Sequence, residues 1–66
     1  MKYRIFVVDE TNQSDMYMAK SIQIMGNGGW LMIKDARLWQ VNDGDWSDET
    51  FTRTFPRERV LWIDED

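Results

Sequence analysis

The sequence predicts an all-β fold, a small antiparallel barrel or strongly bent sheet with roughly five or six short strands. Apolar and polar side chains alternate with a two-residue period, and clusters of Gly, Asn and Asp separate the alternating runs. No segment repeats apolar residues at the three- and four-residue spacing of an amphipathic helix over several turns. We therefore expect a single domain, residues 1–66, with strands near residues 2–8, 16–25, 30–34, 37–41, 49–55 and 60–64.

Residues 16–33 are expected to form the hairpin on which the other strands pack. They include one charged residue, Lys20, before a Gly/Asn turn at residues 26–29 that tolerates positive φ. Alternation along residues 16–25 places four apolar side chains on one face, which we expect to be buried: Met16, Met18, Ile22 and Ile24. Beyond the hairpin, residues 34–36 form either a tight turn or a bend within one continuous strand.

The last part of the chain is expected to hold two strands joined by one helical turn. Pro56 cannot donate a hydrogen bond to a sheet, so it ends the strand before it. The order Phe55, Pro56, three further residues, Val60 and then Ile63 resembles the end of SH3-like barrels, where a 3₁₀ turn links the last two strands. The resemblance implies an SH3-like architecture. It does not imply binding to proline-rich peptides, because the acidic, tyrosine-rich start of signalling SH3 domains is missing.

The expected core takes at least one residue from each predicted strand. It consists of Ile5, Ile22, Ile24, Leu38, Phe51, Val60 and either Ile33 or Met32. Trp39 and Trp62 are also assigned to the core, because a chain of 66 residues depends on its large aromatic side chains for buried area.

The composition excludes several kinds of chemistry. The chain has no histidine and no cysteine, which removes thiol nucleophiles, serine-histidine triads, disulfides and the usual zinc ligands. Its carboxylates lie in polar segments, where burial does not tune a pKa for catalysis. We predict a protein that is not an enzyme and uses no cofactor or metal. No apolar run is long enough for a membrane span or a signal peptide, so we expect a cytoplasmic protein without membrane contact.

Candidate partner-binding residues come from the turns and the C-terminal part of the chain. Trp and Arg are common in binding hot spots, and two tryptophans lie beside turns. Carboxylates surround one of them, at a spacing that does not match an EF-hand calcium loop. The candidates are Trp30, Trp46, Arg57, Arg59, Asp43, Asp45, Asp48 and Glu49.

We interpret the chain as a small protein-binding module, an accessory or inhibitor protein that docks a larger protein. Its aromatic and methionine content exceeds what so small a core can hide. In one version of this hypothesis the clustered carboxylates imitate nucleic-acid phosphates. The alternative is a nucleic-acid-binding small barrel that uses Lys34, Arg53, Arg57 and Arg59, although a net charge of −4 disfavours it.

A structural homo-oligomer is the third interpretation. Residues 21–33 carry no charge, whereas exposed edge strands usually carry lysine, proline or another feature that prevents pairing with a second chain. The hairpin is therefore either central in the sheet or covered by another subunit. The small core favours a homodimer, with Met25, Trp30 and Met32 at the contact.

Overall fold

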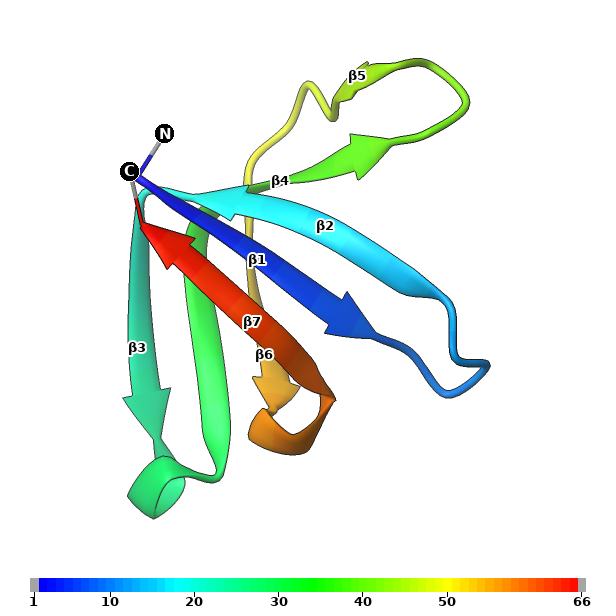
Figure 1. Ribbon diagram of the computed structural model, residues 1–66. Helices are drawn as coiled ribbons and strands as arrows, with labels where there is room; N and C mark the ends of the chain where they lie inside the picture. Colours follow the sequence, from blue (N-terminus) through cyan, green and yellow to red (C-terminus); the bar gives the residue numbers. More distant parts are fainter. Residues whose placement is uncertain (1, 66) are drawn as a thin grey trace.

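The computed structural model describes residues 2–65, which form an all-β fold as predicted (Figure 1). The elements are β1 (Tyr3–Val8), β2 (Ser14–Ala19), β3 (Ser21–Met25), the 3₁₀ turn η1 (Gly26–Gly28), β4 (Trp30–Gln40), β5 (Asp45–Trp46), β6 (Phe51–Pro56), the 3₁₀ turn η2 (Arg57–Arg59) and β7 (Val60–Glu65). None of the described elements is a helix with the length and apolar character needed to cross a membrane.

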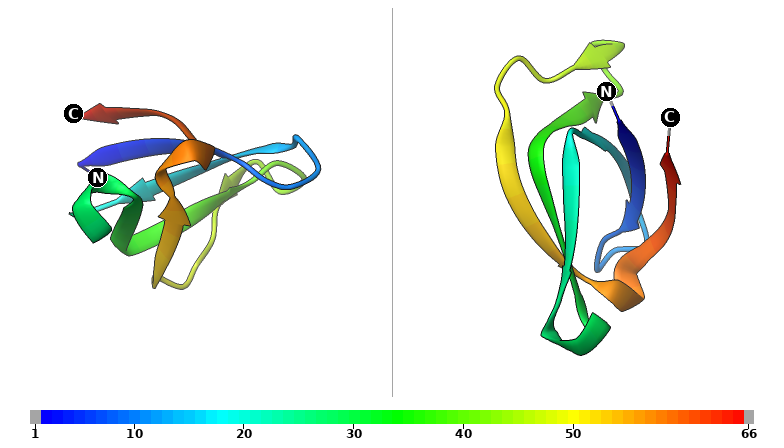
Figure 2. Two further views of the ribbon diagram at one scale, coloured as in Figure 1. Left: turned by 90° about the horizontal axis from the view of Figure 1, so that it is seen from below. Right: turned by 90° about the vertical axis from the view of Figure 1, so that its left-hand side faces the viewer.

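The strands form one antiparallel sheet that curls into a half-barrel. Its order is β3-β4-β2-β1-β7, and β5 and β6 pair with β4 outside this path. Figure 2 shows β6 and β7 at the two sides of the curl, joined through η2. The predicted single turn between the last two strands is therefore confirmed at Arg57–Arg59. The short strand β5 was not predicted, because Asp45 belongs to an Asn/Asp-Gly turn expected at residues 42–45 and Trp46 lies just beyond that turn.

Strand β4 is continuous through residues 34–36, which confirms the second of the two alternatives for that segment. Its first half pairs with both β3 and β6, and its second half pairs with β2 and β5. The change of direction occurs at Asp35, whose φ of 51° is left-handed, next to a register shift between Ile33 and Ala36. Asp tolerates this conformation better than most residues because its short side chain is polar and unbranched.

The Gly/Asn turn joins β3 to β4 as expected, in the form of η1. Asn27 has a φ of 58° and the Gly29 amide donates to the Gly26 carbonyl oxygen at 3.1 Å. Gly26 has a φ of 61°, and a Cβ added there would lie 2.9 Å from Cδ1 of Trp30. Glycine at this position therefore permits both the turn and the close approach of the indole.

The core lies on the concave side of the curl. Its buried residues are Ile5, Val7, Tyr17, Ala19, Leu31, Ile33 and Ala36. Ile22, Leu38, Phe51 and Val60 are partly buried and pack against them, as predicted. The alternative between Ile33 and Met32 is decided for Ile33, which is fully buried.

The prediction that Ile24 is a core residue is wrong, since 55% of its surface is exposed. Residues 16–25 were also expected to be one strand, but the extended segment is interrupted at Lys20, which separates β2 from β3. Within β2 the buried side chains are Tyr17 and Ala19, on the face opposite to the one predicted. Methionine and tyrosine make both faces of β2 apolar, so alternation alone could not identify the inner face.

We predict that Asp35→Val lowers the free energy of unfolding by about 1–2 kcal/mol, because a β-branched residue disfavours a left-handed backbone. Asp35→Gly should stay within about 1 kcal/mol of the wild type. Asp64→Val makes the same chemical change at an exposed strand position without positive φ, and should change stability by less than about 0.5 kcal/mol. Urea unfolding followed by tryptophan fluorescence measures all three. Equal losses for the two valine variants would contradict a strained bend.

Candidate functional site

The second half of β4 and strand β5 form a hairpin that projects from the half-barrel (Figure 1). We call residues 39–49 the acidic arm. Its turn is closed by two amides, of Asp43 and Gly44, which both donate to the Gln40 carbonyl oxygen, at 3.1 and 2.8 Å. Gly44 supplies a positive φ of 67°. Val41, at the start of the turn, is 81% exposed, so the end of the arm contacts little of the body.

Two tryptophans pair across the arm. Trp39 and Trp46 are cross-strand partners, and their ring centroids lie 5.1 Å apart at 73°, an edge-to-face geometry. Both are only partly buried. Trp39 was assigned to the core by sequence. In the structure it packs on Trp46 instead, on the outer side of β4, because the alternating neighbour Leu38 packs against the core.

Ser47 fixes the base of the arm to β4. Its amide donates to the Leu38 carbonyl oxygen at 2.8 Å, and its Oγ accepts from the Leu38 amide at 3.0 Å. Nη1 of Arg37 donates to the Ser47 carbonyl oxygen at 3.4 Å. The serine side chain thus acts as one more backbone partner for β4 and orients the tryptophan before it.

The acidic arm accounts for the whole net charge of the protein. Asp43, Asp45, Asp48 and Glu49 are exposed, and residues 38–52 contain no Lys or Arg. The chain has twelve acidic and eight basic residues, so the eight acidic residues outside the arm balance the eight basic ones. Among the described residues no three Asp or Glu side chains converge as metal ligands would. The carboxylates therefore face solvent on the same hairpin as the tryptophan pair.

The other predicted binding residues are Trp30, at the start of β4 just after η1, and Arg57 and Arg59, in η2. Both 3₁₀ turns lie at the end of the molecule away from the arm (Figure 1). Trp30 is 47% exposed and is the cross-strand partner of Pro56. The Arg57 amide donates to the Gly29 carbonyl oxygen at 2.9 Å, which brings Arg57 beside Trp30. The structure therefore divides the eight predicted residues into two groups, and does not unite them in one site.

Arg59 belongs to a shallow, open depression that it forms with Pro56 and with the turn between β1 and β2, including Asp9. The Asp9 carboxylate accepts hydrogen bonds from the Thr11 hydroxyl at 2.7 Å and from the amides of Thr11 and Gln13. These bonds, the Thr11 hydroxyl first, lower the pKa of Asp9, and the positive charge of Arg59 adds to the effect.

Sequence reasoning missed an aromatic pair on the outer face of β1 and β7. Phe6 and Trp62 lie with ring centroids 4.8 Å apart, and Trp62 is 55% exposed, although it was assigned to the core. The bulge in the pairing of β1 with β7 explains the error, because it shifts the alternation between Val60 and Ile63. The available sequence signal was the three-residue spacing of Val60 and Ile63. Two residues three apart in a strand can both face inward only if a bulge lies between them.

Arg53, a candidate for nucleic-acid binding, is engaged within the fold. Its Nη1 donates to the Tyr17 hydroxyl oxygen at 2.9 Å, and its guanidinium lies 4.6 Å from the centroid of the Phe51 ring. These contacts cover one side of the core with an amphipathic side chain.

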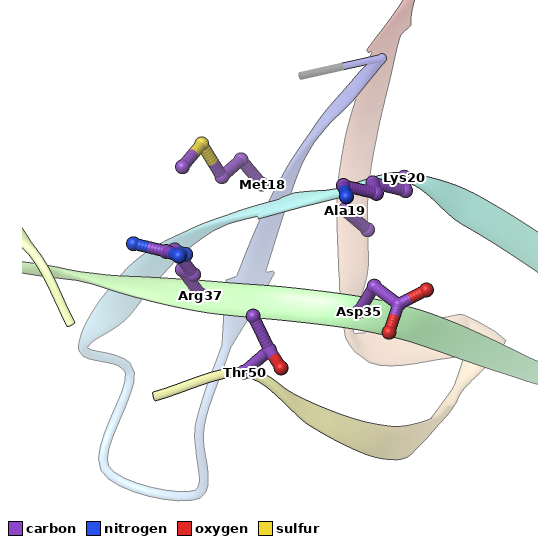
Figure 3. A pocket seen from close by; sticks show the side chains of 6 residues that line it. All are labelled: Met18, Ala19, Lys20, Asp35, Arg37 and Thr50. Carbon is purple, nitrogen blue, oxygen red and sulfur yellow. The ribbon is translucent and has the colours of Figure 1, made fainter. Parts of the chain in front are cut away.

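A cavity of about 100 Å³ lies beside the bend of β4 and is lined by Met18, Ala19, Lys20, Asp35, Arg37 and Thr50 (Figure 3). Figure 3 shows the charged ends of Asp35 and Arg37 pointing away from each other along β4. Pockets for small molecules usually measure about 300–1,000 Å³, so this space suits a few water molecules.

Comparisons of the chain with models of protein families, with curated proteins and with solved structures found no match.

We predict that Asp9 makes the free energy of unfolding depend on pH in the acidic range. The pKa of Asp9 is lower in the folded state than its value of about 3.9 in the unfolded chain, so the ionised carboxylate stabilises the fold. This stabilisation is fully present when the pH is above the unfolded pKa. It is lost as the pH falls below the unfolded pKa and then through the folded pKa. Asp9→Asn should therefore be less stable than the wild type at neutral pH, and the difference should shrink at about pH 3. Urea unfolding at both pH values tests this. A difference that is the same at both would contradict the assignment to the Asp9 charge.

Proposed function

We propose that this chain is a small non-catalytic module that binds a larger protein, and that the acidic arm is its contact surface. The partner we infer is a protein with a basic surface. The observation that carries the proposal is the coincidence, on one projecting hairpin, of the entire net charge and a partly exposed tryptophan pair.

The charge supports a basic partner. Four exposed carboxylates without a basic residue between them create a negative potential, which attracts a complementary surface and speeds association. The tryptophans support a protein partner. Tryptophan is enriched among hot-spot residues, and a pair that packs edge to face presents a rigid apolar contact at little cost in conformational entropy.

The same arm supports an accessory or inhibitory role. Carboxylates on a narrow projection can enter a channel that binds nucleic acid and occupy the positions of phosphates, which would make the protein an inhibitor of that partner. In an accessory role, the same residues would instead bind a basic surface of the partner outside its nucleic-acid channel. Competition with DNA separates these two roles.

The non-catalytic part of the proposal is supported by the sequence, since the chain lacks histidine and cysteine. The alternative of a nucleic-acid-binding barrel is less well supported. Of its four proposed basic residues, Arg53 is bonded to Tyr17 and Arg59 lies beside the Asp9 carboxylate. The acidic arm, which carries the tryptophan pair, is also negatively charged and would repel phosphates.

The test compares two variants of equal charge. The arm variant carries Asp43→Asn, Asp45→Asn, Asp48→Asn and Glu49→Gln. The body variant carries Glu10→Gln, Glu58→Gln, Asp64→Asn and Glu65→Gln, four exposed positions outside the arm. Each chain is immobilised and exposed to heparin-binding proteins from a lysate of the source organism, and captured proteins are quantified by mass spectrometry.

We expect at least one protein whose capture falls about tenfold or more with the arm variant and with Trp46→Ala, since hot-spot tryptophans contribute about 2 kcal/mol or more. Capture by the body variant should match the wild type. If duplex DNA displaces the captured protein, the arm acts as a phosphate mimic, and if it does not, the chain is an accessory protein. Equal losses for both charge variants, or no loss for the arm variant, would refute the proposal.

A further inference from the structure

Strand β3 is an edge of the sheet without the usual protection. Among the described residues it pairs with β4 alone, and its sequence from Ser21 to Met25 has no charge and no proline. An unprotected edge presents free backbone donors and acceptors to any other strand.

The other outer strands of this sheet each carry a protective feature. Strand β7 has a bulge opposite β1 and ends in Asp64 and Glu65. Strand β6 contains Arg53 and ends in Pro56. Strand β5 is two residues long and begins with an aspartate. The lack of any such feature in β3 is therefore specific to this strand.

Ile24 shows where a second strand would fit. It is the cross-strand partner of Leu31, so both side chains lie on the inner face of the sheet. Leu31 is fully buried, but Ile24 is 55% exposed because no described element lies beyond β3 to cover it. A further strand on this edge would bury Ile24 on the inner face and complete the hydrogen bonds of the β3 backbone.

We propose that the strand on this edge is β3 of a second copy of the chain, antiparallel, with Gln23 on the two-fold axis. In this register Ile22 lies opposite Ile24 of the second copy, and Ser21 lies opposite Met25 of the second copy. Ile22 and Ile24 both lie on the inner face of the sheet, so this register keeps the inner faces of the two copies on the same side. An axis at Ile22 or Ile24 also keeps the faces matched, but it leaves two residues of β3 unpaired at one end.

A second copy fits better than a foreign strand because β3 is complementary to itself. The strand has five residues with an isoleucine on each side of its centre, so a two-fold axis brings each partly buried Ile22 against an exposed Ile24. Among the described strands each chain offers one unprotected edge, so the pairing closes at a dimer and does not continue into a fibre.

This dimer contact keeps Met25 of the contact expected from sequence but not Trp30 and Met32. Trp30 and Met32 lie on β4, one strand in from the edge, so they meet the second copy less directly than Ile24 does. The acidic arm lies at the other end of β4 (Figure 1), and the dimer therefore leaves both arms free. The inference does not depend on the proposed binding function.

The test uses single cysteines, since the natural chain has none. Directly opposed residues in an antiparallel pair have Cα atoms about 4.5–5.5 Å apart, within disulfide range, whereas diagonal neighbours are about 7–8 Å apart. On mild oxidation Gln23→Cys should form a covalent dimer. Ile22→Cys and Ile24→Cys should each stay largely uncrosslinked alone and should crosslink when mixed. Val41→Cys, at the most exposed apolar position described, measures the background of random collisions.

Light scattering of the unmodified chain at micromolar concentration should give twice the chain mass. Ile24→Lys should raise the dimer dissociation constant at least tenfold, and Leu61→Lys, at an equally exposed position on β7, should leave it unchanged. A wild-type monomer throughout the accessible concentration range would overturn the proposal. So would crosslinking of Gln23→Cys at the rate of Val41→Cys.

Discussion

A single left-handed residue allows one strand to organise the whole molecule. Asp35 bends β4, so that its first half lies between β3 and β6 while its second half pairs with β2 and β5. Three of the buried core residues, Leu31, Ile33 and Ala36, come from this strand and lie on both sides of the bend. A straight strand of eleven residues would carry one of these halves away from the concave core, so the curl of the sheet depends on this conformation.

Both proposed contact surfaces follow from the length of β4. Its C-terminal end extends past the last residues paired with β2, and there it supports β5 and the tryptophan pair. Its N-terminal half supports β3, which no other described strand covers. A chain of this size cannot enclose both ends of its longest strand, and the apolar side chains left at these ends are available to other molecules.

The all-β class, the Gly/Asn turn and the last 3₁₀ turn could be predicted because each depends on local backbone chemistry: positive φ near Gly26, and the missing donor of Pro56. The inner face of β2 could not, because Met16 and Tyr17 are both apolar and only pairing decides which faces inward. Alternation assigned Ile24 to the correct face but could not show that the neighbouring position in the sheet is empty. For the candidate site, composition could only nominate Trp46 and the neighbouring carboxylates. The separation of Trp30 from Trp46 depends on the topology, which puts Trp30 at the start of β4 and Trp46 at the end of β5.

Amide hydrogen exchange of β4 tests most directly whether this strand holds the two parts of the sheet together. Residues in one cooperative unit exchange with a common opening free energy, which for the most stable unit equals that of global unfolding. We expect the amides of Leu31 and Ile33, before the bend, and of Arg37, which pairs with Met18 of β2 after it, to share the global value obtained from urea unfolding. A clearly lower opening free energy on one side of Asp35 would show that the two parts unfold separately, and would contradict the central role given to β4.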